Sequence, residues 1–161
     1  MYELLNKVLN LLMDEIGILK NILEIQNAKT KFIVENKVAY IVELNNKENI
    51  EVKRLNDIEN SRYQYMNEIS KIIDKDNINI DDLILLSDGD IKERLMKAKN
   101  DIEDVILKLK KVNEINQGLI KSSLEYIDFM VNLISSNQLE TSYEKSGKNI
   151  DKSRSLFDIK L

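Results

Sequence analysis

The sequence predicts an all-α protein, an elongated antiparallel helical bundle or coiled-coil hairpin with one long C-terminal helix and a mobile tail. Two observations favour this fold class. The 161 residues include no proline and only four glycines, so few positions force a helix to end. Apolar residues recur at spacings of three and four along most of the chain, which is the spacing of one helix face. The length and the 43% hydrophobic content suit a single domain.

The first two helices are expected over about residues 2–35 and 38–73. In the first, leucine, isoleucine and valine cover a broad face, so this helix should contact several neighbours. Asn36 and Lys37 interrupt the pattern. The apolar stripe of the second helix is narrower than that of the first, and the second helix carries more charged residues. Both differences indicate a larger solvated face.

Residues 74–90 hold most of the turn-forming side chains, chiefly aspartate, asparagine and one glycine. Between them, a short capped helix is expected over residues 81–86. Its four consecutive apolar residues are predicted to form a plug against the long helices, and they are Leu83, Ile84, Leu85 and Leu86.

The last helix, over about residues 90–137, carries a heptad pattern. One seam line is Leu95, Ile102, Leu109, Asn116, Ser123 and Met130, and the other is Ala98, Val105, Val112, Leu119, Tyr126 and Leu133. A third line of Ile106, Ile120, Ile127 and Ile134 widens the stripe. The seam predicts that Tyr126 and Met130 are core residues. The bundle is thus expected to end at residue 137, with a flexible tail over residues 138–161.

Composition excludes most kinds of active site. The chain has no cysteine and no histidine, and it contains no phosphate-binding loop, nucleophile elbow or calcium-binding loop. We therefore expect no catalytic site, no metal and no cofactor. An enzyme built on the acidic residues between 74 and 90 is the least supported alternative.

A net charge of −4 argues against a nucleic-acid surface. Without a signal peptide or a long apolar run, the chain is expected in the cytoplasm and not inserted in a membrane.

Polar residues interrupt the apolar seam of the last helix. Asn116 and Ser123 occupy equivalent heptad positions, with Asn113 and Gln117 nearby. A buried asparagine at such a position sets the register of packed helices. The same amides could instead form hydrogen bonds with a partner, and the spacing does not decide between the two roles.

Three local motifs resemble the FlgN family of flagellar export chaperones. The charged second helix carries the first motif, the segment 113–124 (Asn-Glu-Ile-Asn-Gln-Gly-Leu-Ile-Lys-Ser-Ser-Leu) carries the second, and the tyrosine and glycine at either end of residues 143–147 form the third. In the second helix, the residues that carry the resemblance are Lys47, Glu48, Ile50, Glu59 and Arg62. The order of the helices resembles the family's architecture as well.

This resemblance implies a substrate-specific chaperone of flagellar type III export. Its clients would be hook–filament junction proteins, bound through their C-terminal helical region, kept unpolymerised and delivered to the export apparatus without ATP hydrolysis by the chaperone. Under this interpretation the distal half of the last helix and the tail form the client surface. The candidate residues are Asn113, Asn116, Ile120, Leu124, Ile127, Val131, Tyr143, Leu156 and Phe157.

The alternative is a structural or regulatory coiled-coil protein that acts by homodimerisation through its heptads. A constitutive parallel dimer would use the same seam that intramolecular packing and client binding require. The oligomeric state, monomer or weak dimer, is left open by the sequence.

Overall fold

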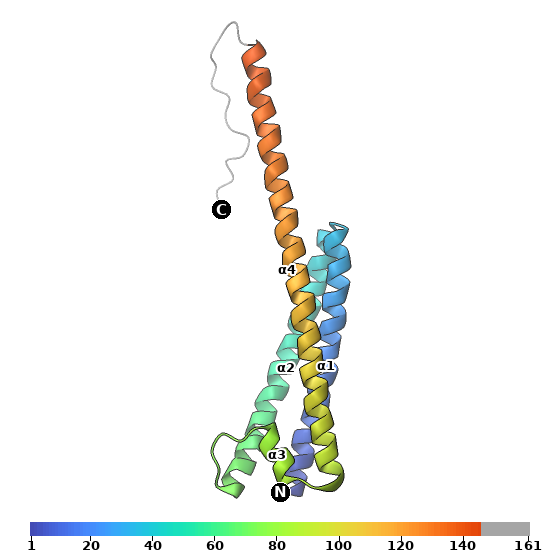
Figure 1. Ribbon diagram of the computed structural model, residues 1–161, viewed down its shortest axis with the longest axis vertical. Helices are drawn as coiled ribbons and strands as arrows, with labels where there is room; N and C mark the ends of the chain where they lie inside the picture. Colours follow the sequence, from blue (N-terminus) through green and yellow to red (C-terminus); the bar gives the residue numbers. More distant parts are fainter. Residues whose placement is uncertain (146–161) are drawn as a thin grey trace. The chain divides into compact units, whose positions relative to one another are not determined.

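The computed structural model describes the backbone of residues 1–145 and the side chains of residues 1–135. Four helices follow one another along the chain (Figure 1): α1 (Tyr2–Val34), α2 (Val38–Ile73), α3 (Ile80–Leu86) and α4 (Gly89–Lys145). The described residues contain no strand. The prediction of an all-helical bundle is confirmed.

The contacts divide the chain into two units, Met1–Ile120 (unit 1) and Lys121–Leu161 (unit 2), and α4 contributes to both. This helix continues through Lys145, past the expected end at residue 137. Residues 138–145 contain neither glycine nor proline, so nothing local forces the helix to end there. Residues 146–161, which include the rest of the expected tail, lie outside the described part of the chain.

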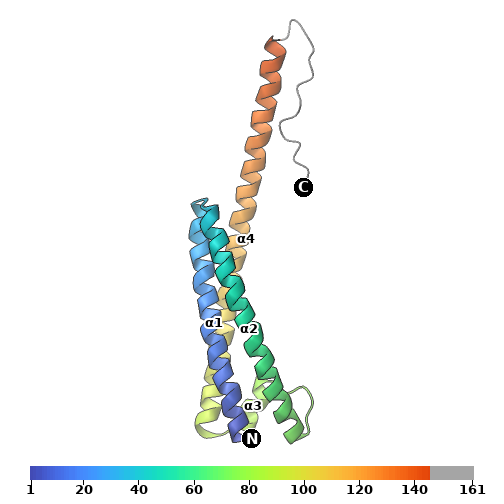
Figure 2. The same cartoon turned by 180° about the vertical axis from the view of Figure 1, so that it is seen from behind.

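In unit 1 the first part of α4 runs beside α1 and α2, with α3 at one end (Figures 1 and 2). All four helices contribute to its hydrophobic core. A three-residue turn reverses the chain between α1 and α2, and Asn36 takes a left-handed backbone conformation there, with φ of 53°. The rings of Phe32 and Tyr40 stack across this turn, with centroids 4.8 Å apart. The largest fully buried side chains are Leu9, Leu12, Ile69, Leu83, Leu95 and Val8.

Only one face of α3 contacts this core. Its N-terminus is closed by a capping box between Asn79 and Asp82. Leu83 is completely buried, whereas Leu85 is 79% exposed and Leu86 is also exposed. The prediction of a four-residue apolar plug was therefore wrong in part, because consecutive helical residues point in different directions and only some can face the same neighbour.

α1 and α4 run in parallel with a fixed register. A hydrogen bond joins Thr30 to Asn116, 86 positions later. The same offset separates Leu5 from Ile91, which line one hollow at the first turns of the two helices. By this register, Val34 at the end of α1 corresponds to Ile120, the last residue of unit 1.

This register explains where the heptad seam of α4 is buried. Leu95, Ala98, Ile102 and Val105 are buried in unit 1, as predicted. Tyr126, however, is 63% exposed and Met130 is 38% exposed, so the prediction that they are core residues was wrong. The heptad continues past Ile120, but α1 has no further residues to pair with it.

Candidate partner-binding surface

A layer of polar side chains joins three helices of unit 1, in the middle of otherwise apolar packing. The side-chain amide of Asn116 donates to the backbone oxygen of Gln26 at 3.0 Å and to its Oε1 atom at 2.9 Å. The Thr30 hydroxyl lies 2.7 Å from Asn116 Oδ1, to which it donates. Asn116 is only 4% exposed. Its amide is therefore fully used in holding α4 against α1.

The same layer continues from α1 to α2 through Glu48. Its carboxylate accepts a hydrogen bond from Gln26 and forms an ion pair with Lys29. Both α1 side chains are buried. A buried charge is tolerated when it is paired and hydrogen-bonded, and Glu48 meets both conditions. We call Gln26, Lys29, Thr30, Glu48 and Asn116 the polar layer.

A second polar contact between α1 and α2 lies nearer the start of α1. Arg62 Nε donates to Glu15 Oε2 at 3.1 Å, and the Glu15 side chain is almost entirely buried. Burial raises the pKa of Glu15 above its ordinary value, and the positive charge of Arg62 opposes this rise. Glu48, Arg62 and Asn116, three of the residues that carry the family resemblance, thus each make an inter-helix contact.

The candidate residues in unit 1 differ in accessibility. Asn113 and Ile120 are exposed on α4, whereas Asn116 faces α1. The client-binding role of all three stays a prediction. For Asn116, the hydrogen bonds to α1 leave its amide no free donor, so it does not belong to an accessible surface.

In unit 2, α4 carries a line of exposed apolar side chains. Leu124 is 57% exposed, Ile127 53%, Val131 48% and Ile134 56%. Their spacing of three and four residues places them on one face of the helix. The first three are sequence candidates, and Ile134 belongs to the third apolar line. We call these four residues the distal stripe. The Tyr143 side chain, Leu156 and Phe157 lie outside the described residues.

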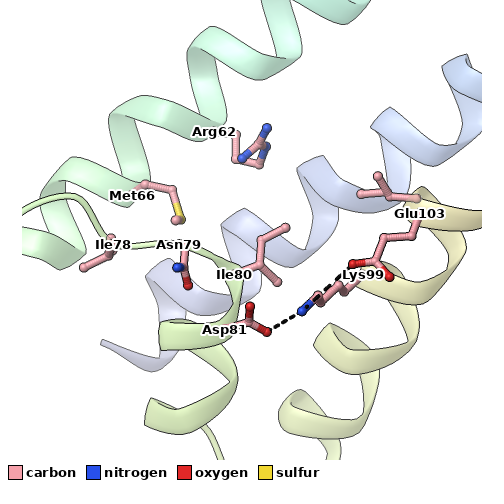
Figure 3. A pocket seen from close by; sticks show the side chains of 9 residues that line it. Arg62, Met66, Ile78, Asn79, Ile80, Asp81, Lys99 and Glu103 are labelled. Carbon is pink, nitrogen blue, oxygen red and sulfur yellow. Dashed lines mark hydrogen bonds and ion pairs between the residues drawn. The ribbon is translucent and has the colours of Figure 1, made fainter. Parts of the chain in front are cut away.

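A hollow of about 470 Å³ in unit 1 is another candidate for a binding site (Figure 3). It lies between α2, α4 and the segment that leads into α3. Its charged side chains are paired with one another or with a neighbour: Lys99 with Asp81 at 2.6 Å and with Glu103 at 4.0 Å, and Arg62 with Glu15. Met66 and Ile102, which are both buried, also line it. No uncompensated charge is left to select a ligand.

Among residues 1–135, no three carboxylates come together in a group that could hold a metal ion. No helix in the same part of the chain is both long and apolar enough to cross a membrane.

Comparison with known proteins identifies the family. The family model described as FlgN protein matches residues 1–150, nearly the whole chain. No curated protein and no solved structure matches it. FlgN proteins are a family of chaperones that serve flagellar export. Since the match extends through all four helices, the chain belongs to the FlgN family of flagellar export chaperones.

Proposed function

We propose that this chain acts in the cytoplasm, binds the C-terminal helical region of hook–filament junction proteins, and keeps these clients unpolymerised until the export apparatus takes them. The observation that carries the proposal is the distal stripe, a row of four exposed apolar side chains on one helix face. Family membership supports the export role, and the stripe supports the kind of client.

A helical client segment suits this surface for physical reasons. Segments that assemble into helical polymers carry an apolar stripe of their own, and that stripe self-associates unless a complementary one covers it. The residues of the distal stripe recur at positions i, i+3, i+7 and i+10, which matches the anchors of an amphipathic helix. Burying each Leu or Ile contributes roughly 1.5–3 kcal/mol, offset by the cost of ordering the partner.

The hydrophobic core does not depend on this stripe. Each of its side chains is about half exposed or more, whereas Leu95 on the same helix is completely buried. Substitutions in the stripe should therefore change binding far more than they change the stability of unit 1.

The test is a calorimetric titration of the full chain with a peptide that spans the C-terminal helical region of a junction protein from the same cell. We expect one-to-one binding for the wild type. Leu124→Ser/Ile127→Ser should weaken it by roughly tenfold or more, because two apolar anchors are lost.

A charge-neutral control lies on the opposite side of α4. Lys121 and Glu125 form an exposed ion pair at 3.9 Å, and the double substitution Lys121→Ser/Glu125→Ser should leave the affinity within about threefold of the wild type. Absence of binding by the wild type to every junction protein of the cell would refute the proposed client. Equal effects of the two double substitutions would refute the stripe as the site.

A further inference from the structure

Unit 2 carries a second line of apolar side chains beside the distal stripe. Tyr126 and Met130 continue the heptad seam of unit 1 beyond Asn116 and Ser123, and both are exposed. We call the apolar residues Tyr126 and Met130, together with the polar Ser123 that precedes them on the same seam, the distal seam. With 3.6 residues per turn, the centres of the distal seam and of the distal stripe lie roughly 100° apart around the helix axis.

The polar residues of this segment gather on the side opposite the gap between the two lines. Its charged and amide side chains are Lys121, Glu125, Asp128 and Asn132, all of which are exposed. The apolar arc of unit 2 is therefore much wider than one partner helix covers, since a single packed neighbour buries a narrow seam. A helix with two adjacent apolar lines is typical of one that packs against two neighbours.

The second line begins only where unit 1 ends. In unit 1 the positions equivalent to the distal stripe are mostly polar, namely Lys99, Glu103, Ile106, Lys110, Asn113 and Gln117. There α4 presents the seam alone, and the antiparallel pair α1 and α2, with α3, covers it. From Ile120 onward the line becomes Ile, Leu, Ile, Val and Ile. The sequence thus changes from one apolar line to two at the level where α1 ends.

The residue types of the distal stripe do not suit a two-stranded coiled coil. With Leu124 and Val131 at a positions, Ile127 and Ile134 fall at d positions. Isoleucine at d disfavours parallel dimers, and Leu at a with Ile at d favours assemblies of three or more helices. The flanking g positions hold Ser123 and Met130, which offer no charge to pair with a second copy.

From these observations we propose that unit 2 binds two helices of one client molecule, one on the distal stripe and the other on the distal seam. This proposal rests on the proposed function. The observation that supports it is that the distal seam continues the line of α4 that a pair of antiparallel helices covers in unit 1. A client that supplies two helices would extend this multi-helix packing along α4, and it would leave the side of the helix that carries Lys121, Glu125 and Asp128 in solvent.

The test uses the full chain and a full-length junction protein of the same cell. Two variants are compared by titration, Leu124→Ser/Ile127→Ser on the distal stripe and Tyr126→Ser/Met130→Ser on the distal seam, with Lys121→Ser/Glu125→Ser as the control. Both apolar variants should bind roughly tenfold or more weakly than the wild type, and the control within about threefold. Because the substituted side chains are exposed, circular dichroism should show the same helix content and melting temperature for all four proteins.

Hydrogen exchange on the client identifies what each line holds. We expect two separate client segments to be protected in a one-to-one complex. In the complex with the stripe variant, one client segment should lose its protection from exchange sooner than the other. In the complex with the seam variant, the order of the two segments should be reversed.

Three results would overturn the two-helix proposal while leaving the client assignment intact: wild-type affinity of the seam variant, protection of a single client segment, or a complex of two chaperones with two clients, in which a second copy covers the seam. Failure of the wild type to bind any junction protein would instead remove the proposed function together with this inference.

Discussion

The side-chain amide of Asn116 on α4 donates to both the backbone oxygen and the Oε1 atom of Gln26 on α1, at 3.0 and 2.9 Å. These two residues stand 90 positions apart in the chain. A shift of α4 by one turn would take the buried Asn116 amide away from both Gln26 oxygens and from the Thr30 hydroxyl, and an unsatisfied buried polar group costs more than a single hydrogen bond gains. The pair therefore fixes the register at which α1 and α4 pack.

Replacing Asn116 by alanine should lower the free energy of unfolding by about 1–3 kcal/mol. Truncation removes a donor to both Gln26 oxygens and one of the two acceptors of the Thr30 hydroxyl, while the surrounding helices still bury these groups. Urea unfolding followed by circular dichroism measures the difference.

Asn113→Ala provides the matched control, three residues earlier on the same helix but exposed. Its effect should remain within about 0.5 kcal/mol of zero. Equal destabilisation by the two substitutions would show that the polar layer does not hold the helices together and that loss of an asparagine on α4 matters only locally.

The buried carboxyl of Glu15 should make one part of the pH dependence of stability run opposite to the usual direction. Burial is the largest influence on this group and raises its pKa above the ordinary value of 4.5, despite the charge of Arg62. A pKa that is higher in the folded state favours folding below the unfolded-state value, and this contribution is lost as the pH rises through the folded-state value. The unfolding free energy of the wild type should therefore fall relative to that of Glu15→Gln over this interval.

Asp82→Asn is the control of opposite sign. The ammonium group of Lys75 and the backbone N–H of Asn79 hold the pKa of Asp82 below its ordinary value of 3.8. Its contribution is present above that value and is lost as the pH falls through the lowered one, so the wild type should gain stability relative to Asp82→Asn with rising pH. A series of urea titrations across the acidic range distinguishes the two slopes. Parallel slopes for both variants would contradict the environment assigned to Glu15.

The helices and much of the core were predictable from the sequence because both depend on local periodicity. Three- and four-residue spacings identify α1, α2 and α4, and the heptad correctly predicts the burial of Leu95 and Val105. Periodicity does not reveal how long the partner helix is. Tyr126 has the same heptad position as Val105, yet it is exposed because α1 ends at Val34.

The polar layer was only half visible in the sequence. Asn116 stands out within an apolar seam, but its α1 partners were missed. A signal for them exists: Gln26 and Lys29 lie on the same helical line as Ile22 and Ile33, where apolar residues are expected. That Glu48 completes the layer could not be inferred, since its pairing with α1 depends on how the two helices align in space.

The two glycines of α4 should respond to alanine in opposite directions. Gly118 lies in the helix interior, and a Cβ atom there would meet nothing within 4 Å. Gly118→Ala should therefore raise the unfolding free energy by roughly 0.5–1 kcal/mol, through the higher helix propensity of alanine and the reduced entropy of the unfolded chain.

Gly89, at the start of α4, also has open space around it, but its φ of +50° is a conformation that alanine adopts at a cost of about 1–2 kcal/mol. Gly89→Ala should lower stability accordingly. Thermal unfolding of both variants decides the matter: a loss of stability in Gly118→Ala would mean that the helix bends or is approached closely at this point, and a gain in Gly89→Ala would mean that the turn before α4 does not need its left-handed residue.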